Sequence, residues 1–174
     1  MSGTGEMLEG GDPAADRRAF RRSLGMFATG VTVVTARAGD QMVGVTANSF
    51  TSVSLDPPLV LWSIDKSSTS LPIFMAGTHF AVNVLAQGQI ALSNHFARTA
   101  PDKFGGVDWT PGAGGAPLIS GTAAVFECRR AVEHDAGDHI LMVGHVERHA
   151  RFDRDVLLFH AGTYKAATAH PDAG

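Results

Sequence analysis

The segment Gly137-Asp138-His139 combines a glycine turn, a carboxylate and an imidazole at the point where an apolar run, residues 140–143, begins. Loops at the ends of strands are where rigid scaffolds present reactive side chains. An imidazole in such a place can titrate near neutral pH, exchange hydrogen bonds or bind a metal ion. Taken alone, a histidine here is more often a structural turn residue than a catalyst, so the role of His139 depends on its surroundings.

A second polar segment follows a predicted strand and is rich in hydrogen-bonding groups. Its backbone amides and short hydroxyls can bind the polar edge of a flat heterocycle, while its phenylalanine packs against an apolar part of the same molecule. Ser, Thr and Asn are also common turn formers, and the segment by itself favours that simpler role. The candidate binding residues are Thr46, Ala47, Asn48, Ser49 and Phe50.

A third segment, Lys66-Ser67-Ser68-Thr69-Ser70, lies between a predicted strand and a predicted short helix near residues 71–75. Hydroxyls and free amide donors at a helix start can hold an anion, with help from the helix dipole and from the Lys66 charge. Serine and threonine in this position also serve as ordinary helix caps. Both roles stay open, and Ser67, Ser68 and Thr69 are the candidate phosphate ligands.

The segment Asp102-Lys103-Phe104 follows a second predicted helix, which ends near Phe96. Lys103 could neutralise a phosphate, and the two phenylalanines could form the wall of a ring-binding site. In the alternative, Phe96 and Phe104 pin the loop in the core and Lys103 stays in solvent.

Other reactive residues give weaker signals. His145, Glu147 and His149 alternate and would share one face of a strand. That spacing can bind zinc, but a full ligand set is not visible, so we interpret it as a polar strand edge and expect no metal. Cys128 is the single cysteine, which excludes an intrachain disulfide, and its apolar neighbours predict a small buried residue on a strand.

The composition indicates one globular domain. The chain has 174 residues, of which 44% are hydrophobic and 18% charged. Its formal net charge is -3 and it has no long basic block, which argues against a nucleic-acid partner. It contains neither the apolar core of a signal peptide nor a run of transmembrane length, so we expect a cytoplasmic protein with no membrane partner.

The N-terminal region predicts a tail and then a helix. Residues 1–15 are rich in Gly, Glu and Asp and resemble a flexible tail, and residues 169–174 form a short C-terminal tail around a domain of residues 16–168. Phe20, Leu24 and Phe27 would share one helix face, and Gly30 would end the helix. The nearby arginines, which are Arg17, Arg18, Arg21 and Arg22, are expected to form a solvated face.

The rest of the chain is dominated by β patterns. Strands are predicted at residues 31–35, 42–47, 59–64, 80–85, 122–133, 139–148 and 156–164, with a hairpin turn at 38–41 and a helix at 89–96. Residues 98–121 are predicted to be mostly loop, and Asp56-Pro57-Pro58 an extended, stiff connection. Many strands with few short helices favour a mainly β fold, an antiparallel barrel with peripheral helices. No G-x-G-x-x-G fingerprint is present, so a nucleotide must be held in another way.

Together, these segments resemble the flavin reductase-like family, which has the FMN-binding split-barrel fold. The resemblance is carried by the order of Thr-Ala-Asn-Ser-Phe, Ser-Leu-Asp-Pro-Pro-Leu-Val, Lys-Ser-Ser, Asp-Lys-Phe, Gly-Asp-His and Gly-Thr-Tyr. It covers residues 18–166. It implies a homodimeric split β-barrel that binds FMN or FAD near the subunit interface, takes hydride from NADH or NADPH, and passes reduced flavin to a separate monooxygenase.

The resemblance also implies roles for the candidate residues. The segment from Thr46 to Phe50 would contact the isoalloxazine ring and the ribityl chain, and Ser67, Ser68 and Thr69 would hold the phosphate with charge from Lys103. Phe104 would border the flavin and Tyr164 would lie nearby. His139 would stand on the nicotinamide side and orient the hydride donor, with Asp138 fixing its tautomer. Two alternatives are a flavin-binding carrier or sensor without reductase activity and a split-barrel oxidase that keeps its FMN.

Overall fold

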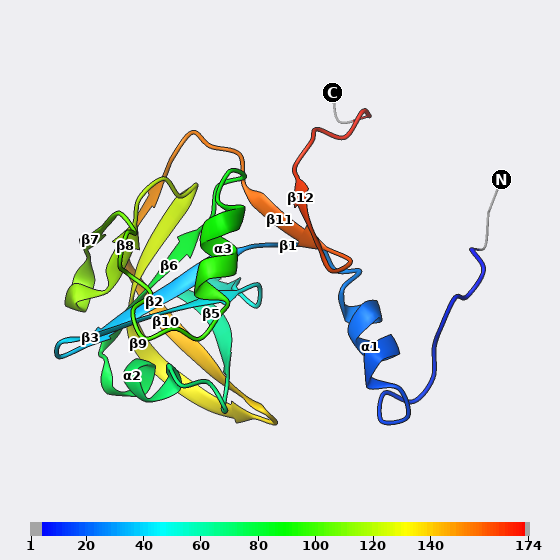
Figure 1. The fold of residues 1–174 in the computed structure, drawn as a ribbon, viewed down its shortest axis with the longest axis horizontal. Coiled ribbons are helices and arrows are strands. Elements are labelled where there is room, and N and C mark those ends of the chain that lie inside the picture. The colour runs from blue at the N-terminus through cyan, green and yellow to red at the C-terminus, as the bar shows by residue number, and fades with distance from the viewer. Residues whose placement is uncertain (1–4, 173–174) are drawn as a thin grey trace.

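The computed structural model describes residues 5–172 and divides into two parts, a β-barrel body and an arm that projects from it (Figure 1). The outermost parts of the two predicted tails, residues 1–4 and 173–174, lie outside the described residues. No helix in the described part of the chain has the length and apolar character needed to cross a membrane.

A seven-stranded antiparallel sheet forms the body, in the order β3-β2-β6-β9-β10-β5-β4. Strands β3 and β4 are its two edges and are not paired with each other, so the barrel stays split at that point. The bounds are β2 (Thr32–Ala38), β3 (Gln41–Ala47), β4 (Thr51–Leu55), β5 (Pro58–Asp65), β6 (His79–Val84), β9 (Ala124–Ala136) and β10 (His139–Arg151). The prediction of a mainly β, antiparallel split barrel is confirmed.

Two short helices and a small hairpin cover the body. They are α2 (Leu71–Ala76), α3 (Ile90–Phe96), β7 (Trp109–Pro111), a 3-10 turn at Ala113–Gly115 and β8 (Pro117–Ile119). One buried cluster contains Trp62, Phe74 of α2 and Phe80. A second contains Phe96 of α3, which packs so closely on β3 that a Cβ at Gly44 would lie 2.5 Å from its ring. The helices are therefore held by apolar burial rather than by their own length.

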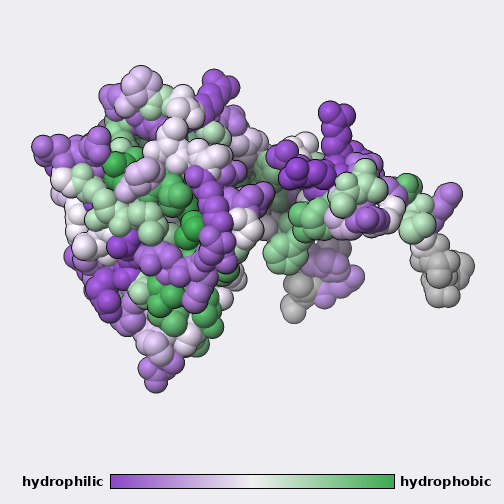
Figure 2. All heavy atoms as spheres, turned by 90° about the horizontal axis from the view of Figure 1, so that it is seen from below, coloured by the Kyte–Doolittle hydropathy of each residue, from purple (hydrophilic) through white to green (hydrophobic). Residues whose placement is uncertain are grey.

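The arm consists of α1 (Arg17–Leu24), β1 (Thr29–Gly30), β11 (Leu157–His160) and β12 (Thr163–Ala166), the three strands pairing as β1-β11-β12. Asp16 caps α1, since its side chain accepts hydrogen bonds from the amides of Arg18 and Ala19, both at 2.9 Å. None of the α1 residues is buried. The space-filling view shows apolar atoms on this projecting part of the molecule (Figure 2).

Several boundaries differ from the sequence-based expectation. The first helix ends at Leu24 with Gly25 as its cap, not at Gly30, because the chain must turn there to pair β1 with β11. The predicted strand at 156–164 is two strands, since Gly162 adopts a positive φ of 78° and reverses the chain. Residues 98–121, expected as loop, contain β7 and β8.

The largest error lies before the proline pair. Residues 51–55 are absent from the predicted strands, but they form β4, which pairs with β5. Asp56-Pro57 is the turn of this hairpin, with Leu55 opposite Pro58, rather than an extended connection. In β4, Val53 and Leu55 alternate with Ser52 and Ser54, but the run is only five residues long and almost wholly exposed as an edge strand, so its strand signal is weak.

Candidate active site

The hairpin tip that carries His139 lies beside the loop that carries the three predicted phosphate ligands. His139 is the first residue of β10 and pairs with Asp65, the last residue of β5. The amide of Lys66 donates a hydrogen bond to the carbonyl oxygen of Asp138 at 2.9 Å. Antiparallel pairing of β5 and β10 thus brings the Gly-Asp-His and Lys-Ser-Ser-Thr segments together, although they are far apart in the sequence.

His139 is held by its neighbour. Its Nδ1 lies 2.7 Å from Oδ1 of Asp138, and its side chain is 41% exposed. This hydrogen bond is the main cause that holds the pKa of Asp138 below its usual value, so the carboxylate is ionised at neutral pH. A carboxylate acceptor favours the proton on Nδ1, which leaves Nε2 able to accept a hydrogen bond. The prediction that the two side chains meet agrees with this geometry.

The turn after β5 is organised by Asp65. Its Oδ1 accepts hydrogen bonds from the amide of Ser67 at 2.7 Å and from the Ser67 hydroxyl at 2.6 Å. These bonds lower the pKa of Asp65, with a further contribution from His139. Ser67 is therefore engaged with a carboxylate, while Ser68 accepts a weak hydrogen bond from the Ser70 amide at 3.3 Å. Asp65 was not singled out in the sequence, although an acid at a strand end before a polar loop is a usable signal.

Lys66 supplies the positive charge beside this loop. Its Nζ lies 2.7 Å from a carboxylate oxygen of Asp135, and both side chains are well exposed. An anion bound at Ser68 and Thr69 would compete with Asp135 for the same ammonium group. The Lys66 charge is available but is already paired with Asp135, so hydroxyl and amide donors must contribute much of any phosphate binding.

The segment from Asn48 to Phe50 reaches the same strand. The Ser49 hydroxyl accepts a hydrogen bond from the amide of Ser63 at 3.0 Å and donates to its carbonyl oxygen at 3.3 Å. Ser63 is two residues before Asp65 on β5, so the two side chains share one face about 7 Å apart. Phe50 packs against Phe126 with ring centroids 5.5 Å apart.

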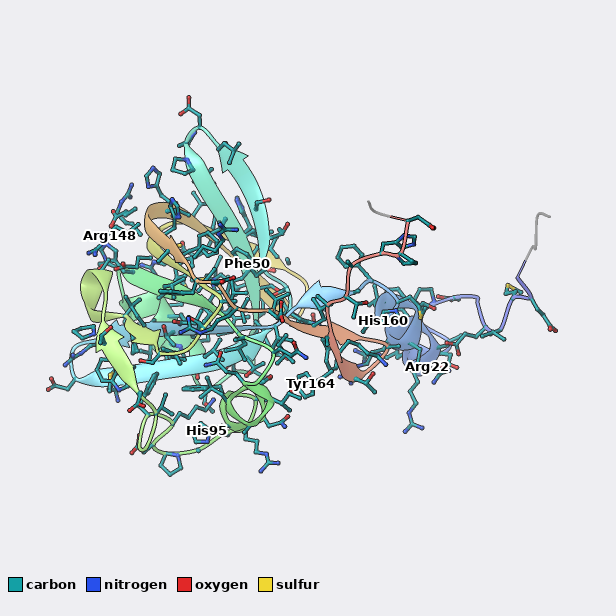
Figure 3. All side chains as sticks on the ribbon, turned by 90° about the horizontal axis from the view of Figure 1, so that it is seen from above. Arg22, Phe50, His95, Arg148, His160 and Tyr164 are labelled. Carbon is teal, nitrogen blue, oxygen red and sulfur yellow. The ribbon has the colours of Figure 1, made fainter. Side chains whose placement is uncertain are left out.

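Thr46 and Tyr164 belong to a hydrogen-bonded chain that runs through α3. The Thr46 hydroxyl donates to the carbonyl of Ser93 at 2.6 Å, and the Ser93 hydroxyl lies 2.9 Å from the Tyr164 hydroxyl. Tyr164 also donates to Oδ1 of Asn94 at 3.0 Å. Figure 3 shows Tyr164 reaching from the arm toward α3. The Thr46 and Tyr164 hydroxyls therefore link β3, α3 and the arm. The carbonyl oxygen of Ala47, next to Thr46 on β3, accepts a hydrogen bond from the Thr32 hydroxyl at 2.7 Å.

Lys103 and Phe104 are not brought to the Ser67–Thr69 loop. The Lys103 ammonium donates to the carbonyls of Gly44 at 2.9 Å and Phe96 at 3.0 Å, and burial lowers its pKa. Phe104 is buried and packs edge-on against Phe96. The sequence alternative in which the two phenylalanines pin the loop in the core matches this arrangement, except that Lys103 is bonded to backbone instead of free in solvent.

Two further sequence interpretations can be compared with the structure. Cys128 is fully buried, and burial raises the pKa of its thiol to about 12, which confirms the prediction of an unreactive packed residue. Glu147 lies at an irregularity in the β9–β10 pairing, forms an ion pair with Arg129 at 3.3 Å and lies 3.3 Å from Nε2 of His79. Within residues 5–172, no three His, Cys, Asp or Glu side chains are grouped as metal ligands would be.

A large pocket adjoins the site on the arm side. Its volume is about 1040 Å³, and it lies between α1, the chain before it, β11 and the loop at Asn48. Asn48 is the one residue of the predicted flavin-binding segment that lines it. The arrangement thus offers an exposed imidazole, hydroxyl donors and a pocket wall around one end of β5, which suits a flat, polar-edged ligand that carries an anion.

Comparison with known proteins identifies the family of the chain. Residues 24–168 match the family model described as flavin reductase like domain. The chain is 53% identical over 147 residues to the FMN reductase (NADH) SmoA of Agrobacterium fabrum, covering 84% of each chain. It is 42% identical over 152 residues to HsaB of Mycobacterium tuberculosis, a reductase subunit of a flavin-dependent monooxygenase, covering 86% of this chain and 81% of that one.

Solved structures show the same relationship in three dimensions. The NADH:FAD oxidoreductase SgcE6 of Streptomyces globisporus superposes with a TM-score of 0.89 at 42% identity, covering 98% of both chains. The structure of SgcE6 in complex with NAD and FAD fragments gives a TM-score of 0.87 at 43% identity, covering 95% of this chain and 99% of that chain. The family match and these relatives together show that the chain belongs to the flavin reductase like family.

Proposed function

We propose that this protein is an NADH-dependent flavin reductase whose product, reduced flavin, is used by a separate monooxygenase. The observation that carries the proposal is the meeting of the Gly-Asp-His tip, the Ser67–Thr69 loop and the Asn48–Phe50 segment at one end of β5. The names of the relatives support both halves of the reaction, since one is an FMN reductase that uses NADH and another is a monooxygenase reductase subunit.

The residues present fit a flavin. Asn48 and Ser49 offer amide and hydroxyl groups to the polar edge of the ring, and Ser68 and Thr69 with Lys66 offer donors and charge to a phosphate. Bound flavin supplies the hydride acceptor, which protein side chains lack. We leave Lys103 and Phe104 out of this proposed binding set, because Lys103 is bonded to backbone carbonyls and Phe104 is packed in the core.

His139 positions the hydride donor. With Nδ1 bound to Asp138, its Nε2 is free to exchange a hydrogen bond with the nicotinamide carboxamide and so fix the ring relative to the flavin. Asp138 stays ionised and keeps the imidazole in one orientation. The protein thus determines distance and angle, and we assign His139 to orientation instead of proton transfer.

A second copy of the chain completes the molecule in this proposal. On helix α1 of the arm, the side chains of Phe20 and Leu24 are 45% and 59% exposed, and leaving this apolar surface in water costs free energy. We therefore propose a homodimer that buries the apolar face of the arm. Because the reductant is NADH, which cells hold in the cytoplasm, we also place the protein there.

The proposal is tested by a steady-state assay that crosses NADH and NADPH with FMN, FAD and riboflavin. We expect NADH oxidation to depend on added flavin and to exceed NADPH oxidation with every flavin. Binding of flavin without acceleration of NADH oxidation would indicate a carrier instead. A protein that keeps its flavin through dialysis and reacts with another substrate would indicate an oxidase.

A further inference from the structure

A second pocket lies at the end of the barrel body farthest from the arm. The β7–β8 hairpin, the ends of β9 and β10 and the segment that follows β10 enclose it, with a volume of about 370 Å³. His139 and Arg148 stand near opposite ends of β10, about 25–30 Å apart at the usual rise of an extended strand. Figure 3 shows Arg148 on the side of the body away from the arm. This distal pocket is therefore separate from the proposed flavin site and from the proposed dimer face of α1.

A buried carboxylate forms one wall of the distal pocket. The Glu127 side chain is 8% exposed, its Oε2 accepts a hydrogen bond from the amide of Ala113 at 2.7 Å, and its Oε1 lies 3.4 Å from Nε of Arg148. A buried carboxylate costs free energy unless it is hydrogen-bonded and paired in this way. The charges of Glu127 and Arg148 thus compensate each other, and the pair adds little net charge to the pocket.

Arg154 supplies a positive charge that is not compensated. Its Nη1 donates a hydrogen bond to the carbonyl oxygen of Thr122 at 3.1 Å, and its guanidinium carbon lies 5.2 Å from the ring centroid of Phe152. Among residues 5–172 no carboxylate lies within ion-pair distance of this guanidinium, and the neighbouring Asp153 and Asp155 do not line the pocket. A guanidinium carries five N–H donors, so a side chain held through one of them still offers the others to a ligand.

The rest of the lining combines apolar surface with a few polar groups. Ile119 and Val125, which are almost fully buried, give the pocket apolar surface together with Leu118. Ser120 adds a hydroxyl, and His149 adds an imidazole that can exchange hydrogen bonds. The volume is in the lower part of the range of small-molecule sites and exceeds what a single inorganic ion fills. The distal pocket therefore suits a small organic molecule with an apolar body.

The charge of the distal pocket selects the polar group of such a molecule. One uncompensated guanidinium balances one negative charge, and its planar fork matches the two oxygens of a carboxylate. A phosphate dianion would add a second negative charge beside Glu127, which Arg148 already balances.

We infer that the distal pocket binds a small organic carboxylate with an apolar or aromatic body, and that Arg154 is the ligand of its carboxylate group. The inference goes beyond the proposed function, because the distal pocket lies outside the site that we assign to flavin and nicotinamide.

The test uses benzoate as the probe, together with two partial analogues. Benzyl alcohol keeps the aromatic body without the charge, and inorganic phosphate keeps a negative charge without the body. Titration of the full-length protein, followed by NMR of its amides, locates each ligand and gives its dissociation constant. We expect benzoate to shift amides within residues 118–127 and 148–154 and to bind about tenfold more tightly than either analogue, the ratio typical of a charged hydrogen bond.

Two variants and a matched control assign the binding to Arg154. Arg154→Met removes the charge and keeps a long side chain, and we expect the benzoate Kd to rise by about tenfold. Ala150→Glu places a carboxylate at an exposed position of the lining, so it should weaken benzoate similarly while the core stays intact. Arg151→Met is the control, because Arg151 points to the opposite face of β10 from Ala150 and does not line the pocket.

Several results would overturn the inference. They are benzoate-induced shifts confined to other parts of the chain, a benzoate Kd unchanged in both Arg154→Met and Ala150→Glu, and equal weakening in Arg151→Met. Binding of phosphate or benzyl alcohol as tight as that of benzoate would also overturn it, because the ligand class rests on the combination of one charge with an apolar body.

Discussion

In the proposed site His139 orients the nicotinamide, and replacing His139 tests that role. In His139→Ala the nicotinamide loses one hydrogen bond, so we expect the KM of NADH to rise by about tenfold while flavin binding is unchanged. Steady-state kinetics with saturating FMN measures both quantities. Asp138→Asn keeps the imidazole but weakens its orientation, and a smaller effect in the same direction is expected. A KM and kcat both near wild type in His139→Ala would rule out the role.

Variants at Ser68 and Lys103 test where the flavin phosphate binds. They distinguish the proposed site at Ser68 from the expectation that Lys103 supplies the charge. Ser68→Ala is expected to weaken FMN by about three- to tenfold and riboflavin hardly at all, because only FMN carries the phosphate. Lys103→Met is expected to lower the free energy of unfolding without this selectivity, since its ammonium bonds the Gly44 and Phe96 carbonyls. Fluorescence titration with FMN and with riboflavin measures the two affinities. A selective loss of FMN affinity in Lys103→Met would contradict our placement of the phosphate site.

The turn at Asp65 is expected to depend on pH. Ser67 lowers the folded-state pKa of Asp65 below its ordinary 3.8, so the ionised form favours the folded turn. This contribution is present above pH 3.8 and is lost as the pH falls through the lower folded pKa. Carboxyl carbon NMR should give an Asp65 midpoint below 3.8 that returns toward this value in Ser67→Ala. A midpoint that does not respond to the Ser67 change would show that the hydrogen bond from the Ser67 hydroxyl is not formed in solution.

At the scale of elements, α3 is fixed by the Tyr164 hydroxyl as well as by apolar packing. Tyr164→Phe removes its bonds to Ser93 and Asn94 and leaves a buried hydroxyl on Ser93 without a partner. We expect a loss of about 1–2 kcal/mol in the free energy of unfolding, measured with urea. Thr163→Val is the control, because it removes an exposed hydroxyl from the same strand and should cost less. Equal losses in the two variants would contradict the role of this bond.

The elements were predicted unevenly, for a physical reason. Residues 59–64 and 80–85 have apolar patterns strong enough to predict β5 and β6, because their side chains are buried in the core. Strand β4 was missed, since it is an exposed edge whose pairing with β5 holds it in place. Helix α1 was predicted too long, because Phe27 continued the apolar pattern into a segment that the arm needs for β1.

At the scale of the whole molecule, the exposed apolar face of the projecting arm predicts that two copies of the chain associate. Ultracentrifugation of the wild type should give the mass of two chains rather than the 18.2 kDa of one. Phe20→Glu/Leu24→Glu places two charges on the apolar face of α1, and we expect the dimer to dissociate at micromolar concentration. Arg17→Glu, on the same helix, should remain dimeric. A monomeric wild type, or a double variant with unchanged mass, would rule out this interface.

The sequence by itself determined the strand-rich pattern, the glycine turn at Gly137 and the presence of three polar segments suited to a flavin. These are local properties, because alternation of apolar residues and the positive φ of 69° at Gly137 depend on neighbouring residues. Only the tertiary structure decided which segments meet. The pairing of His139 with Asp65 joined two of them, while the bonds of Lys103 to Gly44 and Phe96 turned a predicted phosphate ligand toward the backbone. Long-range strand register sets these encounters, and a short sequence pattern does not encode it.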